Sequence, residues 1–105
     1  MGPERRQSVR KKVRLDVAVK IDRPEVFDGK IRDMNLDGAF VEFAGTVPRI
    51  GERLEAMLYL PHRRQLHRIC FPATVLRTES DGAALKFEAY DLPTYKLLVR
   101  TLYSQ

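Results

Sequence analysis

The feature that most constrains the fold is a repeated alternation of apolar and polar residues, interrupted by short turn signals. In the first such segment, every second residue from Val13 to Ile21 is apolar. A period of two is typical of a half-buried strand, because successive side chains of a strand point to opposite faces. A chain with several such segments is expected to fold as an antiparallel sheet around one core.

Five further segments continue this pattern. The expected strands cover residues 27–34, 39–43, 54–60, 66–76 and 83–87. Residues 35–38 and 80–82 carry Asn, Asp, Ser and Gly and therefore predict tight turns, in which Gly38 is expected to adopt a positive φ. Pro72 cannot donate a hydrogen bond to a neighbouring strand, so it predicts an edge or a bulge at that point.

The period changes to that of a helix near the end of the chain. Residues expected on one helical face are Leu92, Tyr95, Leu98, Val99 and Leu102. Asp91 is suited to cap this helix, and Pro93 fits its first turn. Short strands followed by one helix predict a closed or nearly closed all-β barrel with the helix packed on it.

Charge divides the chain into two parts. Residues 1–14 contain six of the nineteen Lys and Arg but one of the fourteen acidic residues, so the net charge of +5 lies at the amino end. We expect residues 1–12 to form a flexible basic arm and residues 13–105 to form a single domain. A basic arm on a neutral body is typical of a protein that binds an anion.

Several classes of function fit the sequence poorly. It contains no apolar run near the length of a membrane span, and Cys70 is the single cysteine, which predicts a cytoplasmic protein. His62, His67 and Cys70 are too few for a zinc site. No nucleophile has a base near it in the sequence, so neither a catalytic residue nor a metal is expected and the chain is interpreted as a non-enzyme.

Two groups of residues are candidates for binding. Arg6 and Arg10 are four residues apart and Arg5 precedes them, and an arginine fork pairs with phosphate or with a guanine edge. Asp33 and Asn35, two apart at the end of an expected strand, can hydrogen-bond a guanine. The alternatives are a solvated basic tail and an Asx turn that forms for local reasons.

Taken together, these groups make the chain similar to the PilZ domain family. Its pattern is RxxxR on an N-terminal arm, matched here by residues 6–10, followed by [D/N]x[S/A]xxG, matched by residues 33–38. The layout of strands and terminal helix agrees as well. One departure is Asn35, which stands where the family usually has serine or another small residue.

The resemblance implies a six-stranded antiparallel β-barrel that binds cyclic di-GMP and needs no cofactor. Arg6 and Arg10 would then hold phosphates and guanine faces, Asp33 and Asn35 would read guanine edges, and Gly38 would allow close approach. Arg5 would stack on a second guanine if the ligand binds as an intercalated dimer rather than a monomer.

The expected mechanism is that the arm closes over the ligand and changes a surface read by a protein partner in motility, secretion or biofilm control. Two alternatives remain open from the sequence. One is a PilZ domain that binds no nucleotide and serves as a protein-interaction module, which Asn35 favours. The other is a small barrel that binds DNA or RNA through its basic arm, although the arm contains no aromatic residue for base stacking.

Overall fold

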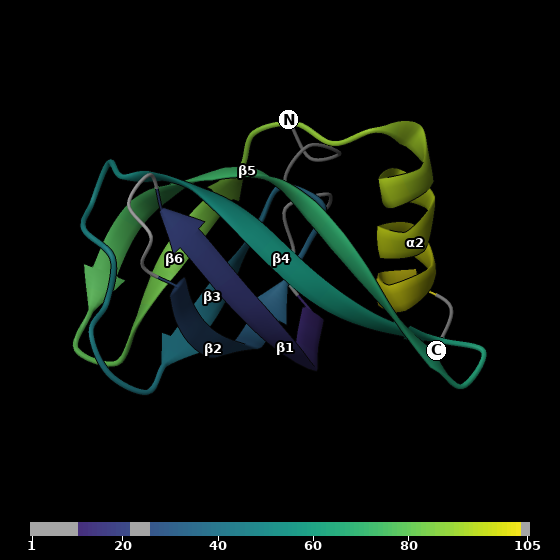
Figure 1. Cartoon of the computed structure of the whole chain (residues 1–105), viewed down its shortest axis with the longest axis horizontal. Helices are drawn as coiled ribbons and strands as arrows, with labels where there is room; N and C mark the ends of the chain where they lie inside the picture. Colours follow the sequence, from purple (N-terminus) through teal and green to yellow (C-terminus); the bar gives the residue numbers. More distant parts are fainter. Residues whose placement is uncertain (1–10, 22–25, 104–105) are drawn as a thin grey trace, which may run out of the picture.

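The computed structural model describes residues 11–21 and 26–103, which form a six-stranded antiparallel barrel and one helix (Figure 1). The elements are β1 (Lys11–Ile21), β2 (Val26–Met34), β3 (Gly38–Phe43), β4 (Arg53–His62), β5 (Gln65–Glu79), β6 (Gly82–Phe87) and α2 (Leu92–Tyr103). The barrel closes in the order β1-β2-β3-β6-β5-β4, so β1 is paired to β2 on one side and to β4 on the other. The predicted barrel with a C-terminal helix is confirmed.

The alternating apolar residues form the inside of this barrel. In β1 the buried side chains are Leu15, Val17 and Val19, and in β5 the predicted inner face of Ile69, Phe71, Ala73 and Val75 is buried as well. Burial of these side chains is the main force that holds the strands together, because each of the larger ones contributes roughly 1.5–3 kcal/mol. Within the described ranges, no helix has the length and apolar character that a membrane crossing requires.

The helix α2 begins as predicted, but the face that it presents to the barrel agrees with the predicted face only in part. The Asp91 carboxylate accepts a hydrogen bond from the backbone N–H of Thr94 (3.0 Å), which caps the helix. Hydrogen bonding to the Thr94 side chain, and secondarily to this N–H, lowers the pKa of Asp91 below its usual value. The buried residues are Thr94, Leu98, Thr101 and Leu102. Leu92 and Tyr95 are exposed by 63% and 43%, so the predicted apolar face is wrong at its start.

Two features of β5 show how the closed barrel accommodates irregular residues. Glu88 donates its N–H to the carbonyl oxygen of Pro72 (2.9 Å), beyond the end of β6. The N and C=O of a strand residue face the same neighbouring strand, so the nitrogen of Pro72 also faces the side of β6. The β6 ladder has already ended at this point, and no hydrogen bond of the ladder is lost. The register shift in β5 lies between Val75 and Arg77 instead, so Pro72 occupies a local edge and not a bulge.

The β4–β5 hairpin is longer than predicted and ends in a tight two-residue turn. β4 continues through Pro61 to His62, which pairs with Gln65, so Arg63 and Arg64 alone connect the strands. Both have positive φ angles, 52° and 65°. This is the conformation of a type I′ turn, which normally uses Asn-Gly because a side chain there costs about 1–2 kcal/mol per residue.

Gly38 is required by packing and not by its φ angle. The expected positive φ at Gly38 is wrong, since Gly51 (φ 83°) is the one glycine of the described residues that has it. Gly38 starts β3 and pairs with Lys86 of β6. A Cβ atom at this position would overlap the backbone carbonyl oxygen of Leu85, which cannot move without disturbing the barrel.

Replacement of Gly38 by alanine is therefore expected to destabilise the barrel whether or not a ligand is present. Overpacking against backbone costs about 1–3 kcal/mol of the free energy of unfolding. Gly45→Ala is the matched control, because a Cβ atom there meets no atom within 4 Å. Urea unfolding of both variants measures the difference, and equal stabilities would contradict the packing explanation.

Candidate functional site

The predicted motif forms the turn of the β2–β3 hairpin. Asn35 donates its backbone N–H to the carbonyl oxygen of Gly38 (3.0 Å), which leaves Leu36 and Asp37 as the two loop residues. The Asn35 side-chain oxygen accepts the backbone N–H groups of Asp37 (2.8 Å) and Gly38 (2.9 Å). Asn35 is 4% exposed. The Asx turn expected from local preferences is thus formed, and the side-chain amide oxygen of Asn35 is used by the hydrogen bonds of this turn.

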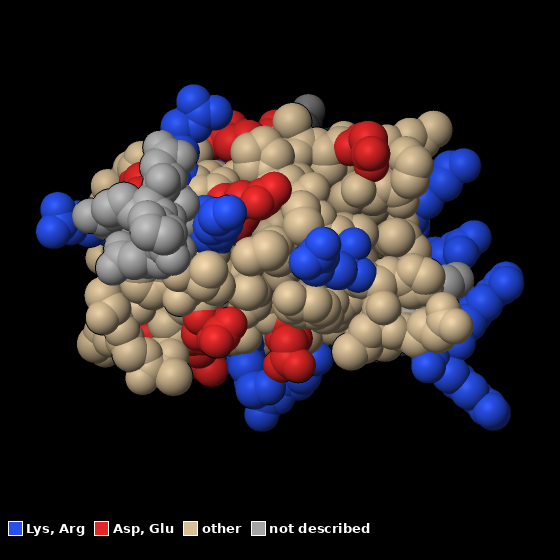
Figure 2. Space-filling view, in the orientation of Figure 1, with Lys and Arg blue, Asp and Glu red and all other residues tan. Residues whose placement is uncertain are grey.

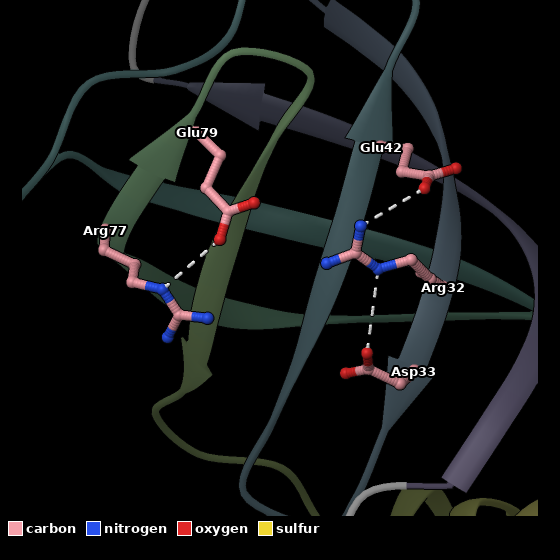
Figure 3. A network of polar contacts seen from close by, with 5 residues as sticks. All are labelled: Arg32, Asp33, Glu42, Arg77 and Glu79. Atoms are coloured by element: carbon pink, nitrogen blue, oxygen red, sulfur yellow. Dashed lines mark ion pairs between the residues drawn. The ribbon is translucent and has the colours of Figure 1, made fainter.

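Asp33 lies just before this turn and faces the outside of the barrel. Its Cα partners are Lys12 on β1 and Phe40 on β3. One Asp33 carboxylate oxygen lies 3.8 Å from Nε of Arg32, whose Nη1 is 3.5 Å from Glu42, as Figure 3 shows. These groups are partly exposed, so the contacts orient the side chains more than they stabilise the fold.

Arg32 is a cation beside the motif that the sequence analysis did not single out. Ile31 pairs with Val41 and Asp33 with Phe40, so Arg32 is the extra residue of a bulge. Its guanidinium lies 3.9 Å from the centre of the Phe40 ring, a cation–π contact. The sequence signal of this bulge is a break in the apolar alternation of β2, since the buried residues Ile31 and Met34 are three positions apart instead of two.

A second set of contacts holds the hairpin loop from the C-terminal side. The Tyr90 hydroxyl donates to the carbonyl oxygen of Leu36 (2.8 Å), and Phe87 donates its N–H to that of Asp37 (2.8 Å). Both loop carbonyls are therefore fixed by residues more than 45 positions away. Neither contact is predictable from the motif, because neither Phe87 nor Tyr90 belongs to it.

Tyr90 also connects the hairpin loop to the helix through aromatic contacts. Its ring meets Phe71 edge-on, with centroids 5.6 Å apart, and stacks on Tyr95 of α2 at 6.4 Å. Burial, and secondarily the charge of Asp37, raise the pKa of the Tyr90 hydroxyl above its usual value. The hydroxyl accordingly remains protonated at neutral pH and able to donate.

The other predicted site residues, Arg5, Arg6 and Arg10, lie outside the described residues. On the face shown in Figure 2, Lys and Arg side chains project along the edge where Figure 1 places α2 and the end of the β4–β5 hairpin. Exposed basic residues of these elements are Arg63, Arg64, Arg68, Lys96 and Arg100.

A separate cavity of about 560 Å³ lies along the same strands, away from the hairpin turn. Its lining includes Asp16, Lys30, Glu42 and Tyr59 but not the motif residues. Two of its carboxylates already have partners, since Asp16 contacts Lys30 at 2.6 Å and Glu42 contacts Arg32. Within the described part of the chain, His, Cys, Asp and Glu side chains form no group of three that could hold a metal.

Loss of the Tyr90 hydroxyl is expected to loosen the hairpin loop without unfolding the barrel. In Tyr90→Phe the ring contacts remain and the Leu36 carbonyl loses its donor. Amide hydrogen exchange at Asp37 and Gly38 should become faster, by about the factor of ten that corresponds to one hydrogen bond.

Tyr95→Phe is the control, because it removes a hydroxyl from the ring that stacks on Tyr90 and not from the ring that reaches the loop. Exchange measured by NMR compares the two variants. Unchanged exchange in Tyr90→Phe would mean that the hydroxyl does not position the loop.

Comparison with known proteins agrees with this geometry. The model of the PilZ domain family matches residues 4–104. No curated protein matches the sequence.

The fold resembles that of the inhibitor of motility MotI/DgrA from Bacillus subtilis, with a TM-score of 0.79 and 23% identity over 95% of this chain. It also resembles the PilZ domain of CeSA from a cellulose-synthesizing bacterium, with a TM-score of 0.69 and 15% identity over 92% of this chain. This chain covers 50% of the length of MotI/DgrA and 97% of that of the CeSA domain.

Proposed function

The chain belongs to the PilZ domain family, in general a family of cyclic di-GMP receptors, and from this premise we propose that it is itself a cyclic di-GMP receptor. The proposed site combines the arginines of the N-terminal arm with the β2–β3 hairpin. PilZ domain proteins are generally not enzymes, and the proposed activity is binding alone.

The observation that carries this proposal is the register at the start of β1. Lys11 pairs with Met34 and Lys12 with Asp33, so β1 begins beside the predicted motif. Arg10 is bonded to Lys11, and consecutive Cα atoms are about 3.8 Å apart. The covalent chain therefore brings the last arginine of the arm within reach of Asp33, which supports a site shared by the two segments.

The proposed chemistry follows from the charge of the ligand and the flatness of its bases. Arg6 and Arg10 pair with the two phosphates and stack on guanine, and Arg5 contacts a second guanine when the ligand is an intercalated dimer. The Asp33 carboxylate accepts the guanine N–H groups, and Asn35 contributes its amide group. Gly38 keeps this end of the hairpin free of a side chain.

Binding is proposed to order the arm against the barrel and so to change a surface that a protein partner reads. Each ordered arm residue costs about 1–2 kcal/mol of conformational entropy, and each charge-assisted hydrogen bond returns about 1.5–3 kcal/mol. The partner is proposed to act in motility, secretion or biofilm control, in the cytoplasm. The similarity of fold to the inhibitor of motility is consistent with this class of partner.

Arg6→Ala and Arg10→Ala are each expected to abolish measurable binding of cyclic di-GMP while the barrel stays folded, because the core is formed by apolar side chains of the described strands and helix. Calorimetric titration with GTP and cyclic di-AMP as reference ligands measures this. Arg49→Ala is the matched control, since Arg49 is exposed and its loop is bonded to Val75 and Glu52 instead of the hairpin.

Unchanged affinity in both arm variants would contradict the proposed site. A polynucleotide binder would instead lose affinity steeply with salt and gain it with strand length, so the same titration against DNA at two salt concentrations separates the two functions.

Asn35→Ser is expected to keep or tighten binding. A serine hydroxyl can still accept a backbone N–H of the turn, as Ser does in related turns, and it occupies less space beside the ligand. The same calorimetric titration, with thermal unfolding to verify the fold, measures the effect. A large loss of affinity at unchanged stability would show that the Asn35 amide makes a specific contact of its own.

A further inference from the structure

The tip of the β4–β5 hairpin combines an unfavourable backbone with exposed charge. Arg63 and Arg64 adopt φ angles of 52° and 65°, which Asn and Gly would adopt at lower cost. The turn is fixed in this form because β4 and β5 stay in register up to the His62–Gln65 pair. Two arginines at positions whose backbone conformation favours Asn and Gly point to a role of these side chains beyond folding.

The charges of this tip are not neutralised by the hairpin that carries them. Residues 56–78 contain no Asp or Glu. Arg63, Arg64 and Arg68 are exposed, and no acidic side chain of the described residues forms an ion pair with them. We call residues 63–68 the basic tip. It extends past the barrel beside the C-terminal end of α2 (Figure 1).

The basic tip also carries an apolar side chain that contributes nothing to the core. Leu66 is 67% exposed, the highest value among the large apolar residues of the described chain. Arginine forks pair bidentately with carboxylates, and arginine is enriched among the residues that contribute most of the binding energy at protein interfaces. The combination suits an acidic protein surface that offers a small apolar pocket.

Two other polyanions fit the basic tip less well. Recruitment by anionic lipids typically uses a cluster of about four to eight basic residues, and the tip alone contains three arginines, so Lys96 and Arg100 of α2 would have to complete such a cluster. Single-stranded nucleic acid is bound on aromatic platforms, and residues 61–70 include no Phe, Tyr or Trp.

We propose that the basic tip is a docking element for an acidic face of a protein partner, in which Arg63 and Arg64 pair with carboxylates and Leu66 enters an apolar pocket. The element is part of the rigid barrel and does not depend on cyclic di-GMP. It can therefore bind a partner in both the free and the ligand-bound receptor.

The decisive variant replaces the turn by its preferred residues, Arg63→Asn together with Arg64→Gly. Relief of the backbone strain should raise the melting temperature by about 5 °C. The same change should weaken binding of an amphipathic peptide of glutamate and leucine by about tenfold, as expected for loss of interface arginines. Stability and binding thus move in opposite directions. Differential scanning fluorimetry and fluorescence anisotropy at physiological salt measure the two effects in the full chain.

Three comparisons make the result specific. Arg49→Ala removes an exposed arginine elsewhere and should leave both quantities unchanged, and Leu66→Ser should weaken the glutamate–leucine peptide but not polyglutamate. The measurements are repeated with Arg6→Ala and Arg10→Ala, so that any contribution of these two arm arginines to binding of the probe is measured separately. Duplex DNA and vesicles of anionic phospholipid serve as competing probes.

Unchanged peptide affinity in the turn variant overturns the proposal. If DNA or vesicles bind more tightly than the peptide, and the turn variant loses this binding, the proposal that the partner is an acidic protein is overturned. An unchanged or lower melting temperature overturns the argument from strain. None of these outcomes depends on whether the chain binds cyclic di-GMP.

Discussion

Closure of the barrel by β1 is the constraint on which the remaining structure depends. β1 forms ladders with β2 and with β4, and its first residue lies across from Met34. Antiparallel pairing then gathers the β2–β3 turn, the β4–β5 turn and the end of β6 at the end of the barrel where β1 begins, and α2 follows β6.

The strands and the start of the helix could be predicted because they depend on local patterns. The period of two is visible in β1 and β5, and Asp91 caps the helix through residues three apart. Of the buried residues of α2, Leu98 and Leu102 could be predicted, but Thr94 and Thr101 could not, because both are polar. These threonines are covered because Leu98 and Leu102 dock on the barrel, which is a tertiary effect.

The candidate site was predictable only where its chemistry is contained in a motif. Asp33, Asn35 and Gly38 form one hairpin, as the spacing implied, but the reason for Gly38 lies in Leu85, which is distant in sequence. Arg32 and Tyr90 enter the same region through a bulge and a long-range hydrogen bond. The bulge leaves only a break in the alternation between Ile31 and Met34, and a contact over 54 positions leaves no local signal in a single sequence.

The same contacts determine which substitutions report on binding and which report on folding. Asn35 and Gly38 both stabilise the hairpin. The side-chain amide oxygen of Asn35 accepts two backbone hydrogen bonds of the turn, and Gly38 has no Cβ atom that would overlap the backbone of Leu85. A substitution at either position that lowers affinity can therefore act through a lost ligand contact or through distortion of the turn, and stability has to be measured with it. Arg32 and Asp33 are partly exposed on the outer face, where a side chain can be removed at little cost to the core. Substitutions there separate recognition from stability, provided that Arg32 and Asp33 are changed singly and together, since the two groups contact each other and their effects do not add.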